Sequence, residues 1–201
     1  MNHRLAIFDF DGTLADSLTW FRSVFGQVAE RYRLRAPDAA EFEVLRPREE
    51  GVEYHVDYAE VGGAECWVIT HNATGPNSAV ALAAIGDDLS DLRALHELVP
   101  HSDDVRVEGV DTYRDFAFLG YRRGGIPRLA VAPIGERFGE FRELEFSEEL
   151  YSASLGGNPE WDAPVVRIGY TSFTQPGQVL DYRVATGEFT LLKQQEVQGG
   201  Y

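Results

Sequence analysis

Residues 105–131 read VRVEGVDTYRDFAFLGYRRGGIPRLAV, and this stretch decides the fold. Three short runs rich in apolar side chains, at 105–110, 116–121 and 129–131, alternate with turn residues that include Gly124 and Gly125. Runs of this length that are rich in β-branched and aromatic side chains and bounded by glycine are typical of β-strands. The stretch therefore predicts consecutive β-strands joined by tight turns.

The same pattern continues on both sides of this stretch. After position 50 the sequence shows no long amphipathic helical pattern. Glycine-containing turns, such as Gly62-Gly63 and Thr186-Gly187, separate the runs. The sequence therefore predicts a mainly β protein, and the further strand-like runs are residues 54–61, 66–70, 80–85, 165–170, 179–184 and 189–192.

The runs repeat along the chain with a long period. Segments that read as closing strands start at residues 95, 141 and 189, which are 46 and 48 residues apart. Central strands start at residues 65, 116 and 165, which are 51 and 49 residues apart. A period of about 40–50 residues with four strands per unit is typical of a propeller blade. The spacing predicts about three blades of an incomplete β-propeller, while an antiparallel β-sandwich remains an alternative.

Several stretches resemble oligopeptidase B of the prolyl oligopeptidase family. The most specific is YSASLGGNPEW at 151–161, followed by RIGYTSF at 167–173. The resemblance runs from about residue 43 to residue 201, in family order and at family spacing. The other stretches are RPREEGVEY at 46–54, HELVPH at 96–101, DVRVEGVD at 104–111 and YRRGGIPRL at 121–129.

This resemblance implies a substrate-gating propeller segment of a serine peptidase that cleaves short peptides after Arg or Lys. The family's propeller has seven blades, and its α/β-hydrolase domain supplies the catalytic serine, aspartate and histidine. The sequence stops at Tyr201, about where the family continues into that domain. It contains no G-x-S-x-G motif, and residues 169–173 only imitate one. We expect no autonomous peptidase activity, no catalytic residue of the peptidase type and no cofactor, with short basic peptides as partners beside a catalytic domain.

The N-terminal sequence carries a different motif. Residues 5–17 read LAIFDFDGTLADS, and a helix is predicted after Ser17 from apolar residues at helical spacing, ending before Pro37. Residues 1–37 resemble the first motif of haloacid dehalogenase-like hydrolases. In that reading Asp9 attacks a phosphoryl group and Asp11 protonates the leaving oxygen and then activates water. Both carboxylates would hold Mg²⁺, which offsets their repulsion.

The remainder of such a hydrolase is hard to find in this sequence. Residues 68–70 imitate its second motif and residues 84–91 its acidic motif, but they lie too close together for the two crossovers required. The sole lysine is Lys193, far downstream. We therefore predict that both imitations are decoys. The expected organisation is a haloacid dehalogenase-like βα fragment at 1–40 and a partial propeller at 41–201.

Composition limits the partners. The formal net charge of −15 disfavours nucleic acid and anionic lipid, and no apolar run approaches the ~20 residues of a membrane helix. The lone cysteine, Cys66, fits a reducing cytoplasm. His96 and His101 are interpreted as packing or surface residues and not as metal ligands. We also expect self-association, because an incomplete propeller leaves open sheet edges.

Three functional hypotheses follow from the sequence. The first is a propeller segment of an oligopeptidase B-like peptidase, with the catalytic domain absent from this chain. The second is a Mg²⁺-dependent phosphatase that uses Asp9 and Asp11. The third is a β-rich binding module without catalysis.

Overall fold

The computed structural model describes residues 18–32, 45–46, 49–197 and 199. The chain divides into two units, residues 1–49 and residues 50–201. In the first unit, helix α1 spans Leu18–Tyr32 and confirms the helix predicted from the apolar spacing. Arg31 lies in its last turn, where the helix dipole favours a cation. The strand predicted before this helix lies outside the described residues.

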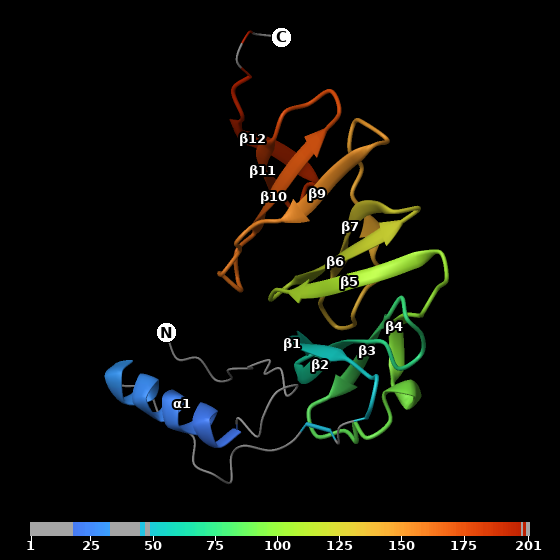
Figure 1. The fold of residues 1–201 in the computed structure, drawn as a ribbon, viewed down its shortest axis with the longest axis vertical. Helices are drawn as coiled ribbons and strands as arrows, with labels where there is room; N and C mark the ends of the chain where they lie inside the picture. The colour runs from blue at the N-terminus through green and yellow to red at the C-terminus, as the bar shows by residue number, and fades with distance from the viewer. Residues whose placement is uncertain (1–17, 33–44, 47–48, 198, 200–201) are drawn as a thin grey trace. The chain divides into compact units, whose positions relative to one another are not determined.

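The second unit contains three antiparallel sheets of four strands each in its described part (Figure 1). In each sheet the strands pair in the order in which they follow one another along the chain. We call the sheets blades 1, 2 and 3. Blade 1 consists of β1 (Tyr54–Val61), β2 (Ala64–His71), β3 (Ala79–Ala84) and β4 (His96–Val99); blade 2 of β5 (Val105–Thr112), β6 (Phe116–Arg123), β7 (Ile126–Pro133) and β8 (Arg142–Glu143); blade 3 of β9 (Tyr151–Leu155), β10 (Val165–Ser172), β11 (Gln178–Arg183) and β12 (Glu188–Gln194).

This arrangement confirms the predicted repeat. The expected central strands are β2, β6 and β10, the second strand of each blade, and the expected closing strands are β4, β8 and β12. Three separate four-stranded meanders form a partial β-propeller, so the β-sandwich alternative is wrong. One short 3₁₀ helix, Leu92–Ala94, lies between β3 and β4.

Glycine pairs make the tightest turns between strands. Gly62 and Gly63 join β1 to β2 with φ angles of 59° and 79°, and Val61 pairs directly with Ala64. Gly124 and Gly125 join β6 to β7 in the same way, with φ angles of 61° and 80°. Two consecutive positive φ angles match the twist of an antiparallel hairpin, and glycine adopts them readily because it has no Cβ.

Strand β6 is buried on both faces because blade 2 lies between the other two. Phe116 and Phe118 contribute to the core shared with blade 3, whereas Ala117 and Leu119 contribute to the core shared with blade 1. Side chains on a strand alternate between its two faces, so one apolar run serves two cores. This accounts for the nearly continuous apolar sequence at 116–121 that first indicated a strand.

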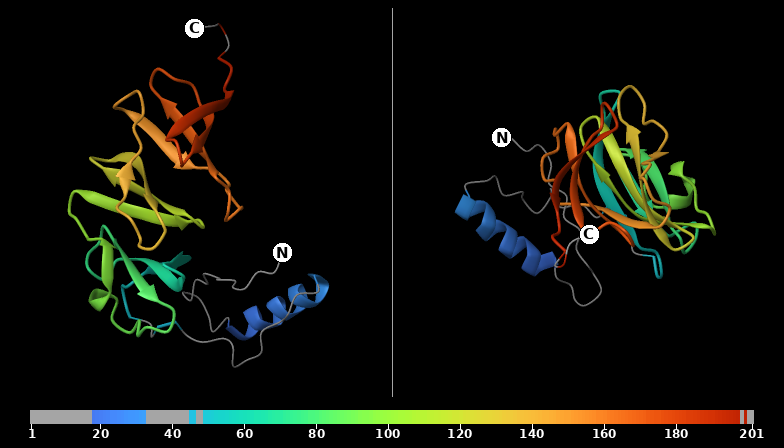
Figure 2. Two further views of the ribbon diagram at one scale, coloured as in Figure 1. Left: turned by 180° about the vertical axis from the view of Figure 1, so that it is seen from behind. Right: turned by 90° about the horizontal axis from the view of Figure 1, so that it is seen from above.

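Two interblade cores hold the second unit together, one between each pair of neighbouring blades, and Figure 2 shows these blades from two further sides. The seam 1/2, between blades 1 and 2, contains the buried residues Ala59, Val68, Val80, Val107, Val110, Ala117, Leu119, Tyr121, Ala130 and Ile134. The seam 2/3, between blades 2 and 3, contains Tyr113, Phe116, Phe118, Leu129, Leu144, Tyr151, Ala153, Val166, Ile168, Tyr170, Leu180 and Tyr182.

The antiparallel order gives every blade two distinct ends. The connections β1–β2, β5–β6 and β9–β10 lie at one end, which we call the first-turn end. Strand β12 finishes at the opposite end, which we call the exit end. In the described part of the chain no helix is long and apolar enough to cross a membrane.

Candidate functional site

Two carboxylates lie on the neighbouring first strands of blades 1 and 2. Strand β1 carries Asp57, on the same face as Ala59 of the seam 1/2, and β5 carries Asp111. These strands contact each other, and the Thr112 hydroxyl donates a hydrogen bond of 2.7 Å to the Tyr58 carbonyl oxygen. Asp57 precedes Tyr58 in the sequence, and Asp111 precedes Thr112, so both acids lie beside this hydrogen bond.

The electrostatics of the two carboxylates are coupled. Burial, and after it the negative charge of Asp111, raise the pKa of Asp57 to about 6, whereas His55 opposes the shift. The surrounding atoms also raise the pKa of Asp111, whose side chain still reaches solvent. Loss of solvent disfavours a charged carboxylate, and a like charge nearby adds to that cost. A cation placed beside this pair would relieve both effects.

Tyr113 extends the acidic region toward blade 3. Burial, with smaller contributions from the charges of Asp111 and Asp57, raises the pKa of its hydroxyl to about 12, whereas a hydrogen bond with Asn158 opposes the shift. Its ring stacks on Phe116, with 4.8 Å between the centroids. The neutral phenol is therefore held in place beside the two carboxylates at neutral pH.

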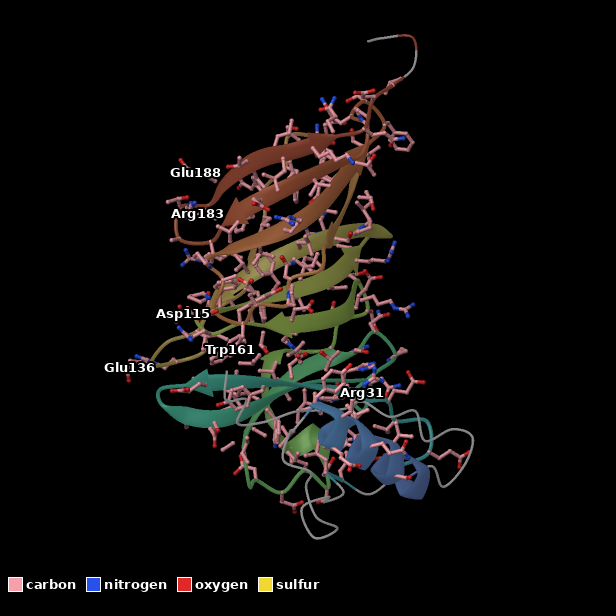
Figure 3. The ribbon with its side chains drawn as sticks, turned by 90° about the vertical axis from the view of Figure 1, so that its left-hand side faces the viewer. Arg31, Asp115, Glu136, Trp161, Arg183 and Glu188 are labelled. Atoms are coloured by element: carbon pink, nitrogen blue, oxygen red, sulfur yellow. The ribbon has the colours of Figure 1, made fainter. Side chains whose placement is uncertain are left out.

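A cavity of about 500 Å³ opens at the first-turn end. Figure 3 shows Asp115, Glu136 and Trp161 close together at this end of the blades. All three blades contribute to its wall, which is formed by Glu60, Gly62, Gly63, Arg114, Asp115, Ile134, Gly135, Glu136 and Trp161. Its polar groups come from turns and from Glu60 near the end of β1, and the ring of Trp161 supplies one apolar side.

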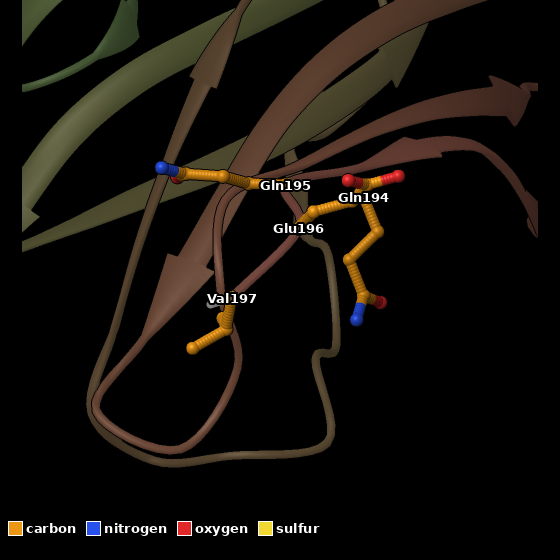
Figure 4. A pocket seen from close by; sticks show the side chains of 4 residues that line it. All are labelled: Gln194, Gln195, Glu196 and Val197. Atoms are coloured by element: carbon orange, nitrogen blue, oxygen red, sulfur yellow. The ribbon is translucent and has the colours of Figure 1, made fainter. Parts of the chain in front are cut away.

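A second hollow, of about 410 Å³, lies beside the chain just after β12 (Figure 4). Only four consecutive residues form it, Gln194 to Val197. Side chains from one extended segment do not converge on a ligand in the way that binding pockets require. We therefore do not treat this hollow as a site.

The residues expected to act under the phosphatase hypothesis, Asp9 and Asp11, lie outside the described residues. The imitation of the second motif is confirmed as a decoy, because Thr70 lies within β2, an antiparallel strand paired with β1 and β3. The acidic imitation is also a decoy. Asp87 accepts a hydrogen bond from the Ala84 amide at 2.8 Å, and Asp91 accepts one from the Arg93 amide at 3.1 Å. These carboxylates cap local turns and do not form a metal site.

The other candidate positions are structural as well. Gly169 lies in the middle of β10, so residues 169–173 form a strand and a turn, without the strand-to-helix elbow of a hydrolase nucleophile. His96 is exposed on β4, and the ring of His101 packs against Gly75, where a Cβ would not fit. Among the described residues no group of three or more His, Cys, Asp or Glu side chains is arranged to hold a metal ion.

The sequence analysis did not single out Asp57 and Asp111. A signal for them exists, since each acid follows a valine in the first strand of its blade, in Val56-Asp57 and Val110-Asp111. An acid that recurs in the first strand of successive blades is a repeat feature that can be read from the sequence.

Comparison with known proteins agrees with this architecture. A family model described as the N-terminal β-propeller domain of prolyl oligopeptidase matches residues 23–195. The chain belongs to this propeller family. The match begins inside helix α1, upstream of residue 43, where the resemblance to oligopeptidase B was expected to start. The comparisons give no support to the haloacid dehalogenase-like segment.

The chain is also similar to a peptidase sequence and to solved structures of oligopeptidase B. Dipeptidyl aminopeptidase BI of Pseudoxanthomonas mexicana is 34% identical over 158 residues, which are 79% of this chain and 21% of that protein. A closed form of oligopeptidase B from Trypanosoma brucei, with covalently bound antipain, is 30% identical with a TM-score of 0.69 and covers 79% of this chain and 22% of its own. Oligopeptidase B from Leishmania major is 29% identical with a TM-score of 0.69, over 83% of this chain and 24% of its own. The chain therefore spans about a fifth to a quarter of the length of these relatives.

Proposed function

We propose that this chain is a substrate-gating propeller segment of an oligopeptidase B-like serine peptidase that cleaves short peptides after Arg or Lys. The observation that supports this best is the set of three consecutive blades within the matched residues 23–195. The sequence contains no G-x-S-x-G nucleophile motif, so the proposed role requires a catalytic domain beside the blades. The lone free cysteine, Cys66, fits a cytoplasmic location.

The proposed partners are short basic peptides, and the pair Asp57 and Asp111 is the proposed contact. Both carboxylates have raised pKa values because of their surroundings, and the negative charge of Asp111 adds to the shift of Asp57, whereas His55 opposes it. An arginine or lysine side chain would supply a compensating positive charge. The net charge of −15 would also draw such peptides to the surface over a long range.

Peptide binding tests this proposal on the chain itself. We expect a fluorescently labelled arginyl-arginyl peptide to bind weakly in anisotropy measurements and to weaken as salt increases. The double variant Asp57→Asn with Asp111→Asn should bind several-fold more weakly. The matched control, Asp103→Asn with Asp181→Asn, changes the net charge equally at other places and should bind like the wild type. Equal loss in both variants would show that only the overall charge matters and would overturn the proposed contact.

The phosphatase remains a second proposal, because residues 5–17 form a complete first motif and α1 follows directly. Here Asp9 and Asp11 would hold Mg²⁺ and carry the chemistry. Incubation with p-nitrophenyl phosphate, with and without Mg²⁺, tests it. Mg²⁺-dependent phosphate release that disappears in Asp9→Asn supports this activity, and silence with both proteins rules it out for this substrate.

Self-association is proposed as a consequence of the partial ring. Leu191 and Leu192 on β12, the outermost strand of blade 3, are 52% and 49% exposed. An exposed apolar edge strand pairs readily with another chain. Light scattering during size-exclusion chromatography should show oligomers that decrease in Leu191→Lys, and a strict monomer at high concentration would contradict the proposal.

A further inference from the structure

The stretch at residues 151–161, the most specific in the sequence, contains the start of an unusually long connection between strands. Residues 156–164 join β9 to β10, whereas residues 62–63 and 113–115 suffice at the equivalent places in blades 1 and 2. A two-residue turn is enough to reverse a strand. The additional residues of the β9–β10 loop are therefore available for contacts beyond blade 3.

Asn158 fixes the base of this loop. Its amide nitrogen donates to the carbonyl oxygens of Gly156 at 2.9 Å and Arg167 at 3.1 Å, and its side-chain oxygen accepts from the Arg167 amide at 2.7 Å. The Gly156 amide adds a bond of 2.8 Å to the Arg167 carbonyl oxygen. These hydrogen bonds fix the direction in which the loop extends from blade 3.

The tip of the loop is attached to blade 2 at the β5–β6 turn. The Arg114 amide donates a hydrogen bond of 2.9 Å to the Trp161 carbonyl oxygen. The guanidinium group of Arg114 lies over the Trp161 ring, 5.4 Å from its centroid, and pairs with Asp162 at 3.3 Å. The ion pair is exposed and contributes little, so the backbone bond and the ring contact carry the attachment.

The ring of Trp161 also contacts blade 1. Its centroid lies 6.0 Å from that of Tyr58 on β1, with an interplanar angle of 50°. The carbonyl oxygen of the same Tyr58 accepts the hydrogen bond from Thr112 of blade 2. Contacts from all three blades therefore meet around Trp161, which is 37% exposed.

We propose that the β9–β10 loop is a strap that fixes the angles between the three blades, with Trp161 as its point of attachment to blades 1 and 2. Each blade is a stiff sheet, but the seams between blades are held by side chains and a few hydrogen bonds. A contact at the first-turn end that spans both seams limits their opening. Under the proposed function, this angle also determines how far the propeller opens at that end.

Hydrogen exchange measured by NMR tests the strap without depending on any peptidase role. The informative amides are Arg114 and Gly62, because Gly62 donates a hydrogen bond of 2.7 Å across the seam 1/2 to the Gly135 carbonyl oxygen. In Trp161→Ala we expect both to exchange about tenfold faster, from the loss of an aromatic contact. Amides within the β2–β3 and β10–β11 pairs should change less than about twofold.

Three further variants complete the experiment. Trp161→Phe keeps a ring and should restore most of the protection. Asn158→Ala releases the base of the loop and should also speed exchange at Arg114. Phe173→Ala, which removes an aromatic side chain that is 89% exposed on another loop, should change neither amide. Unchanged exchange at Gly62 in Trp161→Ala, or an equal increase in every strand, would overturn the proposal.

Discussion

The seam 2/3 is packed largely by aromatic rings, whereas the seam 1/2 is packed mostly by valine and alanine. In the seam 2/3 the ring of Phe118 meets those of Phe116 and Tyr182 edge to face, at centroid distances of 5.8 and 6.0 Å. Such rings bury large apolar areas and prefer this geometry. They join blades 2 and 3 mainly through side chains.

The smaller side chains of the seam 1/2 let backbone groups of the two blades meet directly. The Val107 amide donates to the Asn77 carbonyl oxygen at 2.9 Å, and the Gly62 amide donates to the Gly135 carbonyl oxygen at 2.7 Å. The same seam carries Asp57 with its raised pKa. The comparison teaches that one propeller uses two kinds of blade contact, and that the carboxyl group with the strongly raised pKa, Asp57, lies at the less aromatic one.

The largest expected effect is the loss of an aromatic side chain from the seam 2/3. Phe118 is fully buried, and Phe118→Ala should lower the free energy of unfolding by about 4 kcal/mol through lost burial and a cavity. The matched variant Val68→Ala in the seam 1/2 should cost about 2 kcal/mol. Urea denaturation monitored by circular dichroism measures both, and equal losses would remove the proposed difference between the seams.

A second prediction concerns the polar edge of the seam 2/3. The guanidinium group of Arg128 on blade 2 lies over the Tyr151 ring of blade 3 at 4.6 Å and donates to the Glu149 carbonyl oxygen at 3.3 Å. Its side chain is 14% exposed. Arg128→Met should therefore lower the free energy of unfolding by about 2 kcal/mol. The control Arg122→Met removes an exposed pair with Glu108 and should cost about 0.5 kcal/mol or less in the same urea titration.

The seam 1/2 should show a pH dependence that comes from Asp57. The pKa of Asp57 is raised from 3.8 to about 6 in the folded protein. The stabilising contribution of the neutral carboxyl group is therefore fully present below pH 3.8 and is lost as the pH rises through 6. Asp57→Asn should consequently raise the free energy of unfolding by about 1–2 kcal/mol at pH 8, after allowance for screening by solvent, and by almost nothing at pH 3.5. The charged and titratable groups facing Asp57 are Asp111, His55 and Tyr113.

Chemical denaturation of both proteins at the two pH values measures this effect. A gain that is the same at pH 3.5 and pH 8 would mean that asparagine improves packing, and the assignment of the pH dependence to the Asp57 carboxylate would then be wrong. Asp111→Asn should give a smaller gain at pH 8, since it removes only one of the causes that raise the pKa of Asp57.

The smallest effect is expected on the open face of blade 3, away from both seams. Asp181 accepts a hydrogen bond of 3.1 Å from Arg167, whose side chain is 52% exposed. Asp181→Asn should change the free energy of unfolding by less than about 0.5 kcal/mol, because solvent screens exposed pairs. A loss as large as that of Arg128→Met would indicate that this face is packed against something in solution.

Much of the local structure could be predicted from the sequence. Apolar runs bounded by glycine predicted most of the strands, and the long period predicted the grouping into blades. Strand β9 is the clearest omission. Its residues Ser152 and Ser154 alternate with Tyr151, Ala153 and Leu155, and these small polar side chains do not give the apolar run by which the other strands were found. Its hydrogen bonds to β10 form only in the completed sheet.

The sequence by itself determined the alternation of side chains along each strand, the glycine turns and the helix Leu18–Tyr32, because these depend on neighbouring residues. Only the tertiary structure decided that Asp57 acts on Asp111 and that Trp161 reaches Tyr58. Each of these contacts joins residues of different blades. Their geometry follows from how one sheet packs on the next, and this packing depends on the summed shapes of many side chains, which a local sequence pattern does not encode.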